Sequence, residues 1–200
     1  MFVQMIHSKG GDPGALRDRM DQWVKELGPG ADGWLGSTAG YTPDGEFVAV
    51  ARFQDEAAAQ RNSQRPEQGE WWQATEAMFS DSAVFHDYTN VKDWRGGGSD
   101  TAGFVQIIQG RSTDMERALE LDESMGGDDP SFRPDIIGGL SCWTDGGEFA
   151  QVIYFTSEAE AREGESAEMS EEMKAQMEEW GKISQDVRFL DLKEPWMWSP

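Results

Sequence analysis

The sequence predicts an α+β protein made of two tandem copies of one βαββαβ unit, and three observations support this prediction. The segment 2–6 (FVQMI) recurs as 104–108 (FVQII), at an offset of 102 residues. The same order of strand-like and helix-like patterns follows each copy of that segment. A Gly/Ser-rich stretch separates the copies. We therefore predict units at 1–94 and 103–200, joined by a flexible linker at 95–102.

The repeat extends over the whole of each copy. The same offset superposes Gly45-Glu46-Phe47 on Gly147-Glu148-Phe149, and about 19 of the 93 positions between Phe2 and Trp94 match without a gap. A period of this length indicates a duplicated domain, because solenoid repeats are shorter.

Apolar periodicity and turn residues predict the elements of the first copy. Asp12 and Pro13 are typical of a helix start, and Pro43-Asp44-Gly45 is typical of a hairpin turn. The expected order is a strand at 2–6, a helix from Asp12 to Gly28, strands at 34–41 and 47–53, a helical region at 55–79 interrupted near Pro66, and a strand at 82–91.

The second copy repeats this order. Thr113 and Glu116 could form a capping box, and Gly126-Gly127 is expected to end that helix. The remaining elements are strands at 136–143 and 149–155, a helical region at 157–180 and a strand at 186–192. We interpret the apolar stripe on the 157–180 region as core, its members being Met169, Met173, Met177 and Trp180.

The order strand, helix, hairpin, helix, strand is that of a ferredoxin-like unit, an antiparallel sheet with two helices on one face. In the first strand Phe2 and Ile6 alternate with Val3 and Met5, so both faces of the strand are apolar. Such strands are covered on both faces. We therefore expect the two ferredoxin-like units to pack sheet to sheet as an intramolecular pseudo-dimeric α/β barrel, either a monomer with an internal pseudo-twofold axis or a homodimer of it.

Composition excludes several classes of partner. The net charge is −21 and there is no basic run, which disfavours nucleic acid and anionic membranes as partners. No apolar stretch approaches the roughly 20 residues that span a bilayer, so we expect a cytoplasmic protein. Cys142 is the only cysteine, which excludes an internal disulfide, and we expect it to be a buried hydrophobic residue.

Three segments resemble a known family: 33–40 (GWLGSTAG), 65–68 (RPEQ) and 193–196 (KEPW). Together with the paired units, they resemble the dimeric α/β-barrel superfamily, which includes the antibiotic-biosynthesis monooxygenases, and within it an uncharacterised tandem branch found in actinobacteria. The resemblance implies a ligand cavity between a sheet and its helices or between the sheets. Haem-degrading members place an axial His on a helix, whereas His7 and His86 lie in predicted strands, so haem is not expected.

His86 is the candidate catalytic residue. It lies mid-strand, and a histidine that titrates near neutrality could act as a general base on a phenol or an enol. The alternative is a hydrogen-bonded structural histidine. His7, near the end of the first strand, is expected to be structural. We found no metal-ligand spacing and no phosphate-binding loop, so neither a metal nor a cofactor is assigned.

Five further residues are candidates for binding a small aromatic ligand: Gln4, Arg52, Trp71, Trp72 and Tyr88. Gln4 is polar within an apolar strand, so it is either satisfied structurally or faces a pocket. Trp71 and Trp72 are adjacent on a helix and diverge by about 100°, so only one is expected to face a given pocket. Filling the core is the alternative role for both.

The second copy lacks these candidates. At the same offset His86 corresponds to Arg188, and Trp71-Trp72 to Met173-Lys174, so we expect any pocket in the first copy. The leading functional hypothesis is a cofactor-independent monooxygenase acting on an aromatic or polyketide-like molecule. The alternative is a non-catalytic binding or interaction protein, and an enclosed void of several hundred Å³ would favour the enzyme.

Overall fold

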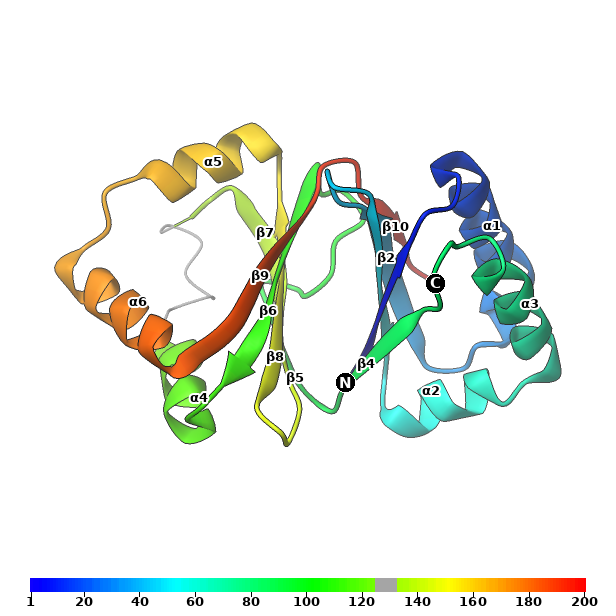
Figure 1. Cartoon of the computed structure of the whole chain (residues 1–200), viewed down its shortest axis with the longest axis horizontal. Coiled ribbons are helices and arrows are strands. Elements are labelled where there is room, and N and C mark those ends of the chain that lie inside the picture. Colours follow the sequence, from blue (N-terminus) through cyan, green and yellow to red (C-terminus); the bar gives the residue numbers. More distant parts are fainter. Residues whose placement is uncertain (125–132) are drawn as a thin grey trace. The chain divides into compact units, whose positions relative to one another are not determined.

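The computed structural model describes residues 1–124 and 133–200, and the chain forms two compact units (Figure 1). Unit 1 consists of residues 1–89 and 192–200, and unit 2 consists of residues 90–191. Each unit contains one five-stranded sheet, and seven strand pairings within the two sheets are antiparallel. The predicted α+β class with two ferredoxin-like units is confirmed.

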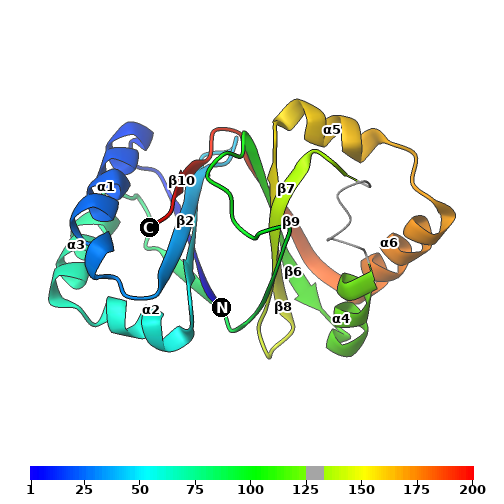
Figure 2. The same cartoon turned by 180° about the vertical axis from the view of Figure 1, so that it is seen from behind.

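Unit 1 follows the predicted order of elements. They are β1 (Phe2–Lys9), α1 (Pro13–Glu26), β2 (Trp34–Tyr41), β3 (Glu46–Phe53), α2 (Glu56–Ser63), α3 (Pro66–Glu76), β4 (Val84–Tyr88) and, from the chain's end, β10 (Trp196–Trp198). The strand order is β10-β2-β3-β1-β4, and its last four strands are those of a ferredoxin-like sheet. All three helices cover one face of this sheet (Figure 2).

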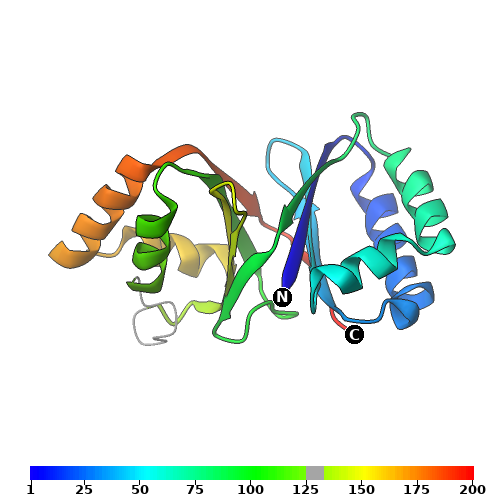
Figure 3. The ribbon, with the colours of Figure 1, turned by 90° about the horizontal axis from the view of Figure 1, so that it is seen from below.

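Unit 2 has the same plan. Its elements are β5 (Asn90–Trp94), β6 (Phe104–Ser112), α4 (Met115–Ser124), β7 (Ile136–Trp143), β8 (Glu148–Phe155), α5 (Glu158–Ser166), α6 (Glu171–Ile183) and β9 (Ser184–Leu192). The strand order is β5-β7-β8-β6-β9. Seen from below, the helices again lie on one face of their sheet (Figure 3).

The compact units do not follow the repeat, because each sheet takes its fifth strand from the end of the other copy. β5 closes the first copy but pairs with β7 of unit 2, Asn90 opposite Trp143. β10 closes the second copy but pairs with β2 of unit 1, Trp196 opposite Ala39. Without these additions β2 and β7 would each present a free row of backbone hydrogen-bonding groups. The predicted ranges 1–94 and 103–200 follow the sequence repeat, whereas the compact units are residues 1–89 with 192–200 and residues 90–191.

The predicted linker at 95–102 is fastened to unit 2. The Arg95 guanidinium donates to the carbonyl oxygens of Arg133 (2.6 Å) and Ile136 (2.9 Å). Arg95 itself has a φ of 47°, in the left-handed region that a non-glycine residue rarely adopts. Ala102, at the far end of the segment, is buried. Gly97 adds a turn, because its backbone N–H donates to the carbonyl oxygen of Trp94 at 2.9 Å. Composition alone could not distinguish such a segment from a free linker.

Local capping explains where the helices of unit 1 begin. The Asp12 carboxylate accepts from the backbone N–H of Ala15, and Asp55 caps α2 by accepting from Ala58. The predicted interruption near Pro66 is the boundary between α2 and α3. Pro66 occupies the first turn of α3, where its missing N–H removes no helical hydrogen bond.

Two expectations for unit 2 are wrong. The expected capping box of Thr113 and Glu116 is replaced by Asp114, whose carboxylate accepts from the backbone N–H of Arg117. Of the methionine stripe, Met169 and Met177 are 42% and 48% exposed, and only Trp180 is buried in the core. Met169 lies between α5, which ends at Ser166, and α6, which begins at Glu171, so it is not on the helix that carries the rest of the stripe. Met173 and Met177 share α6 with Trp180, but of the three only Trp180 is buried. The expected helix end at Gly126-Gly127 lies outside the described residues.

Candidate ligand-binding cavity

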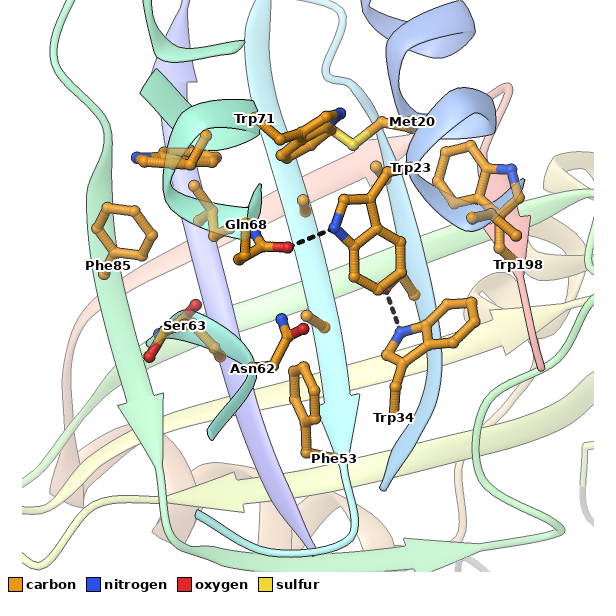
Figure 4. A pocket seen from close by; sticks show the side chains of 18 of the residues that line it. Met20, Trp23, Trp34, Phe53, Asn62, Ser63, Gln68, Trp71, Phe85 and Trp198 are labelled. Atoms are coloured by element: carbon orange, nitrogen blue, oxygen red, sulfur yellow. Dashed lines mark hydrogen bonds between the residues drawn. The ribbon is translucent and has the colours of Figure 1, made fainter. Parts of the chain in front are cut away.

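Unit 1 contains a cavity of about 290 Å³ between its helices and the helix-covered face of its sheet (Figure 4). Most of its lining is aromatic or aliphatic. The lining residues are Gln4, Ile6, Met20, Trp23, Val24, Trp34, Ser37, Ala39, Phe47, Ala49, Ala51, Phe53, Asn62, Ser63, Gln68, Gly69, Trp71, Trp72, Phe85 and Trp198.

Strand register decides which sheet residues reach the cavity. Successive side chains of a strand point to opposite faces, and directly paired residues share a face. Gln4 is paired with Ala51, and Ile6 is paired with Ala49 and Phe85. The floor is therefore built partly from alanine, whose small side chain leaves open the space that a larger residue would fill.

Tryptophans form the walls. The Trp23 ring lies edge-on to Trp34, with centroids 5.0 Å apart, and 6.4 Å from the Trp71 ring. A register shift between Trp34 and Gly36 accompanies the start of β2, where Trp34 pairs with Phe53. Edge-on aromatic pairs hold one another in fixed orientations, so this wall is preorganised.

Both adjacent tryptophans line the cavity, which corrects the expectation that only one would. Trp71 packs beside Trp23, whereas Trp72 packs edge-on to Phe85 of β4, with centroids 5.2 Å apart. The roughly 100° between adjacent helical side chains separates them, but the cavity is wide enough to be bordered by both. The Arg19 guanidinium lies 5.2 Å from the centre of the Trp71 ring and donates to the Trp71 carbonyl oxygen, which holds α3 against α1.

The last strand of the chain supplies a further wall. Trp198 is paired with Ser37 of β2, and its indole N–H donates to Asp21 of α1 at 2.6 Å. Because β10 follows the second copy in sequence, the cavity of unit 1 is completed by a residue of the other repeat. Sequence reasoning missed Trp198 for this reason, since the offset places Trp196 and its neighbours in the second copy of the repeat.

Two amides at the cavity have fixed orientations. The Asn62 oxygen accepts from the Arg65 guanidinium at 3.0 Å, and the Gln68 oxygen accepts from the Trp23 indole N–H at 2.6 Å. Arginine and indole nitrogens can only donate, so each amide oxygen must face them and each NH₂ group must point elsewhere. Figure 4 shows the Asn62 amide between Phe53 and Gln68, directed toward the space that the aromatic rings enclose.

Gln4 has the opposite polarity. Its side-chain nitrogen donates to the Asp87 carboxylate at 2.8 Å, so its oxygen remains available as an acceptor. We expected Gln4 either to have a structural hydrogen-bond partner or to face a pocket. It does both, because it donates to Asp87 and also lines the cavity.

The remaining predicted site residues lie on the other face of the sheet. His86 pairs with Met5, and Arg52 and Tyr88 both pair with Val3, whereas the cavity is reached from Gln4 and Ile6. The structure therefore brings Gln4, Trp71 and Trp72 together and separates them from His86, Arg52 and Tyr88. The alternation of β4 explains the separation, because Phe85 and His86 cannot share a face.

His86 instead belongs to a histidine pair. Its ring lies edge-on to that of His7, with centroids 5.4 Å apart, and Nδ1 of His7 is 2.8 Å from a Glu46 oxygen. The structural role expected for His7 agrees with this contact. A catalytic role for His86 stays a prediction that the position of the cavity does not support.

None of the residues lining the cavity is titratable. Charged residues contact the lining side chains from behind: Arg65 bonds to Asn62, Asp87 to Gln4 and Asp21 to Trp198, and Arg19 lies over the Trp71 ring. A cavity of this kind suits an uncharged, planar ligand, since an ion would lose its hydration without gaining a counter-charge.

Unit 2 places polar groups where unit 1 has its cavity. At the offset of 102, Met20, Ala39 and Ala49 correspond to Asp122, Ser141 and Gln151. The Asp122 carboxylate accepts from both Ser141 and Gln151 at 3.0 Å. Burial of Asp122 raises the pKa of its carboxyl group above the ordinary value, and the two hydrogen bonds oppose that shift.

The closing strand of unit 2 is displaced relative to the repeat. Gln106 is the counterpart of Gln4 and donates to Asp191 at 3.0 Å, as Gln4 donates to Asp87. These bonds equate Asp87 with Asp191, a spacing of 104 residues and not 102. At this spacing His86 corresponds to the buried Leu190, whereas the sequence offset of 102 pairs it with Arg188.

Three further observations concern metal-binding groups, membrane-spanning helices and Cys142. Within residues 1–124 and 133–200, no group of three His, Cys, Asp or Glu side chains is placed to hold a metal ion. In the same ranges no helix is long and apolar enough to cross a membrane. Cys142 is fully buried, as predicted, and burial raises the pKa of its thiol.

Comparison with known proteins gives structural relatives alone. No family model matches the sequence, and no curated protein matches it. A solved structure described as a putative monooxygenase from Fusobacterium nucleatum superposes with a TM-score of 0.73 at 9% identity, covering 96% of this chain and 90% of that one. Another with the same description, from Lactobacillus acidophilus, has a TM-score of 0.70 at 9% identity and covers 99% of both chains.

A third similar structure is described as an anthrone oxidase-like protein. It has a TM-score of 0.68 at 9% identity and covers 99% of this chain and 92% of that one. At such low identity the likeness establishes the fold. The chain therefore shares the fold of these three structures along almost its whole length.

Proposed function

We propose that the protein binds a planar, uncharged aromatic small molecule in the cavity of unit 1. The observation that supports this most directly is the lining, which combines five tryptophans with three amides and no titratable group. Aromatic walls contribute stacking and apolar contact, while a few polar groups orient a ligand. The volume of about 290 Å³ suits a ligand of roughly two to three fused rings.

Titration with fluorene, a planar tricyclic hydrocarbon, tests the binding proposal. Saturable quenching of tryptophan fluorescence at one ligand per chain is the expected result. Ala51→Leu, which extends a side chain into the cavity from its floor, should abolish that quenching. Gly69→Ala lines the same cavity on α3, where an added Cβ meets nothing within 4 Å, and should leave binding intact. Non-saturable quenching, identical in all three proteins, would contradict the proposal.

We propose further that the bound molecule is oxygenated, so that the protein is a monooxygenase-like enzyme. The fold supports this, since two similar structures are described as a "putative monooxygenase" and one as an "anthrone oxidase-like protein". In such a reaction an activated CH₂ group and O₂ give a carbonyl group and water, and the substrate supplies the electrons. Since no lining side chain is titratable, a water molecule in the cavity would accept the proton from the CH₂ group, and the amide N–H groups would stabilise the enolate as it forms.

Oxygen uptake with anthrone tests this second step. Catalysis predicts consumption of one O₂ per anthrone, faster than the spontaneous reaction and abolished in Ala51→Leu. Binding of the tricycle without accelerated uptake would favour the alternative, a binding protein that performs no chemistry on this substrate.

A further inference from the structure

The geometry points to a ligand that carries a hydrogen-bond acceptor at one end and a donor at the other, and that binds in a single orientation. We infer that its carbonyl or quinone oxygen faces Asn62 and Gln68, and that a hydroxyl group faces Gln4. This inference rests on the proposed function, because it assigns polarity to the ligand of the same cavity.

The donor side is defined by partners that cannot accept. Arg65 donates to the Asn62 oxygen and also to the carbonyl oxygen of Leu27, so it is anchored independently of any ligand. Asn62 is only 7% exposed, and its NH₂ group has no hydrogen-bond partner among the described residues. Because Asn62 lines the cavity, a ligand oxygen bound there would accept a hydrogen bond from this NH₂ group.

Gln68 repeats this arrangement one helix later. The Trp23 indole N–H fixes its oxygen at 2.6 Å, and the described residues offer no partner to its NH₂ group. Asn62 lies on α2 and Gln68 on α3, so the donors come from two helices that border the same side of the cavity. Both amide oxygens are occupied, so only the two NH₂ groups are left to bind a ligand. They can donate to a ligand oxygen, which accepts through its lone pairs.

The acceptor side lies on the sheet. The Asp87 carboxylate only accepts while it is ionised, so it fixes the Gln4 nitrogen and leaves the Gln4 oxygen for a ligand hydroxyl. Gln4 lies on β1, whereas the two donors lie on helices that cover the sheet. The cavity therefore has opposite hydrogen-bonding character on its sheet side and its helix side, which a symmetric hydrocarbon would not exploit.

Three tricyclic probes of nearly equal shape separate the contributions of the rings, the carbonyl group and the hydroxyl group to affinity. Fluorene has no polar atom, 9-fluorenone adds one carbonyl oxygen, and 2-hydroxy-9-fluorenone adds a hydroxyl group. Each added hydrogen bond should lower the dissociation constant by about three- to tenfold relative to the preceding probe. Quenching of tryptophan fluorescence reports all three affinities.

Isosteric variants replace the hydrogen-bond donors on the helix side of the cavity with acceptors. Gln68→Glu and Asn62→Asp keep the oxygen that Trp23 or Arg65 requires and replace the NH₂ group with a second oxygen. Each should remove the preference for 9-fluorenone over fluorene while leaving fluorene affinity within about threefold. Gln4→Met should remove only the advantage of the hydroxyl group. Gln73→Glu, an exposed position on the same helix as Gln68, controls for the added charge and should change none of the ratios.

The outcomes distinguish this inference from the proposed function. If the wild type binds fluorene and 9-fluorenone equally, or if Gln68→Glu and Asn62→Asp keep the ketone preference, the polarity is wrong although the cavity still binds aromatics. If no probe binds, the proposed function fails with it. A circular dichroism spectrum identical to that of the wild type establishes that each variant is folded.

Discussion

The two units share one fold and differ in what fills the space beneath their helices. In unit 1, Ala39 and Ala49 line the sheet side of an open aromatic cavity. In unit 2, the corresponding Ser141 and Gln151 donate to the buried Asp122. A few substitutions within a duplicated scaffold are enough to give one copy space for a ligand and the other a polar cluster in the same place.

The closing strands repeat this difference. Phe85 packs against Trp72 and lines the cavity, whereas its counterpart at a spacing of 104 residues, Phe189, is 64% exposed. The residue at the offset position of Trp72 is Lys174, which offers no aromatic partner. The aromatic lining of unit 1 is therefore a set of mutually dependent contacts, and unit 2 lacks several of its members.

Tryptophan removal should show the largest difference between the units. Trp180→Ala deletes a ring that packs on both Trp143 and Phe149, so we expect a loss of about 5 kcal/mol in the free energy of unfolding. Trp23→Ala deletes a ring that partly borders empty space, so the loss should be about 3 kcal/mol. Urea denaturation measures both, and equal or reversed losses would contradict an open cavity beside Trp23.

Much of this comparison could be predicted from the sequence. The strands at 34–41 and 136–143 have the predicted bounds, because alternating apolar residues and glycine turns are local signals. Gln4, Trp71 and Trp72 were identified because polar or clustered aromatic residues stand out in apolar elements. The pocket is expected in the first copy for a related reason, because the second copy has no counterparts of Trp71 and Trp72.

Other features depend on contacts that sequence periodicity does not encode. The exchange of β5 and β10 is a long-range pairing, so neither the unit boundaries nor the role of Trp198 could be read locally. Asn62 and Gln68 lie on otherwise polar helices, where an amide facing a cavity resembles one facing water. His86 was placed in the right strand, but its face relative to the helices required the register with Met5.

Replacing an alanine with leucine should have the next largest effect, because its cost in stability should differ between the two units. Ala51→Leu adds methyl groups to the cavity of unit 1, so we expect stability to change by less than about 1 kcal/mol. Ala161→Leu adds the same groups to a fully buried position of unit 2 and should cost about 1–3 kcal/mol by overpacking. Thermal melts monitored by circular dichroism measure both, and a cost for Ala51→Leu as large as that for Ala161→Leu would show that the cavity is closed.

The buried carboxyl of unit 2 should give a smaller, pH-dependent effect. Because the folded state raises the pKa of Asp122, it binds more protons than the unfolded state once the pH exceeds about 4. The contribution of Asp122 to stability therefore falls as the pH rises from about 4 to the raised pKa. Asp122→Asn keeps an acceptor for Ser141 and Gln151 and should remove this fall. A difference in melting temperature that does not vary between pH 4 and pH 7 would contradict the assignment.

The smallest effect is expected at the histidine on the opposite face. His86→Ala should leave fluorene affinity unchanged within about twofold, because His86 does not line the cavity. The neighbouring Phe85→Ala serves as the matched comparison and should weaken binding, since Phe85 lines the cavity and packs on Trp72. Weaker binding in His86→Ala than in Phe85→Ala would restore His86 as a ligand-binding candidate.

The most direct test of the central claim is a titration with 9-fluorenone followed through the indole N–H resonances of the nine tryptophans in a ¹⁵N–¹H NMR spectrum. Five of them line the proposed site, namely Trp23, Trp34, Trp71, Trp72 and Trp198. A single site in unit 1 predicts that these five resonances shift together and saturate at one ligand per chain, while Trp94, Trp143 and Trp180 of unit 2 stay unchanged. Saturable shifts at the unit 2 tryptophans, or small shifts spread evenly over all nine, would contradict it.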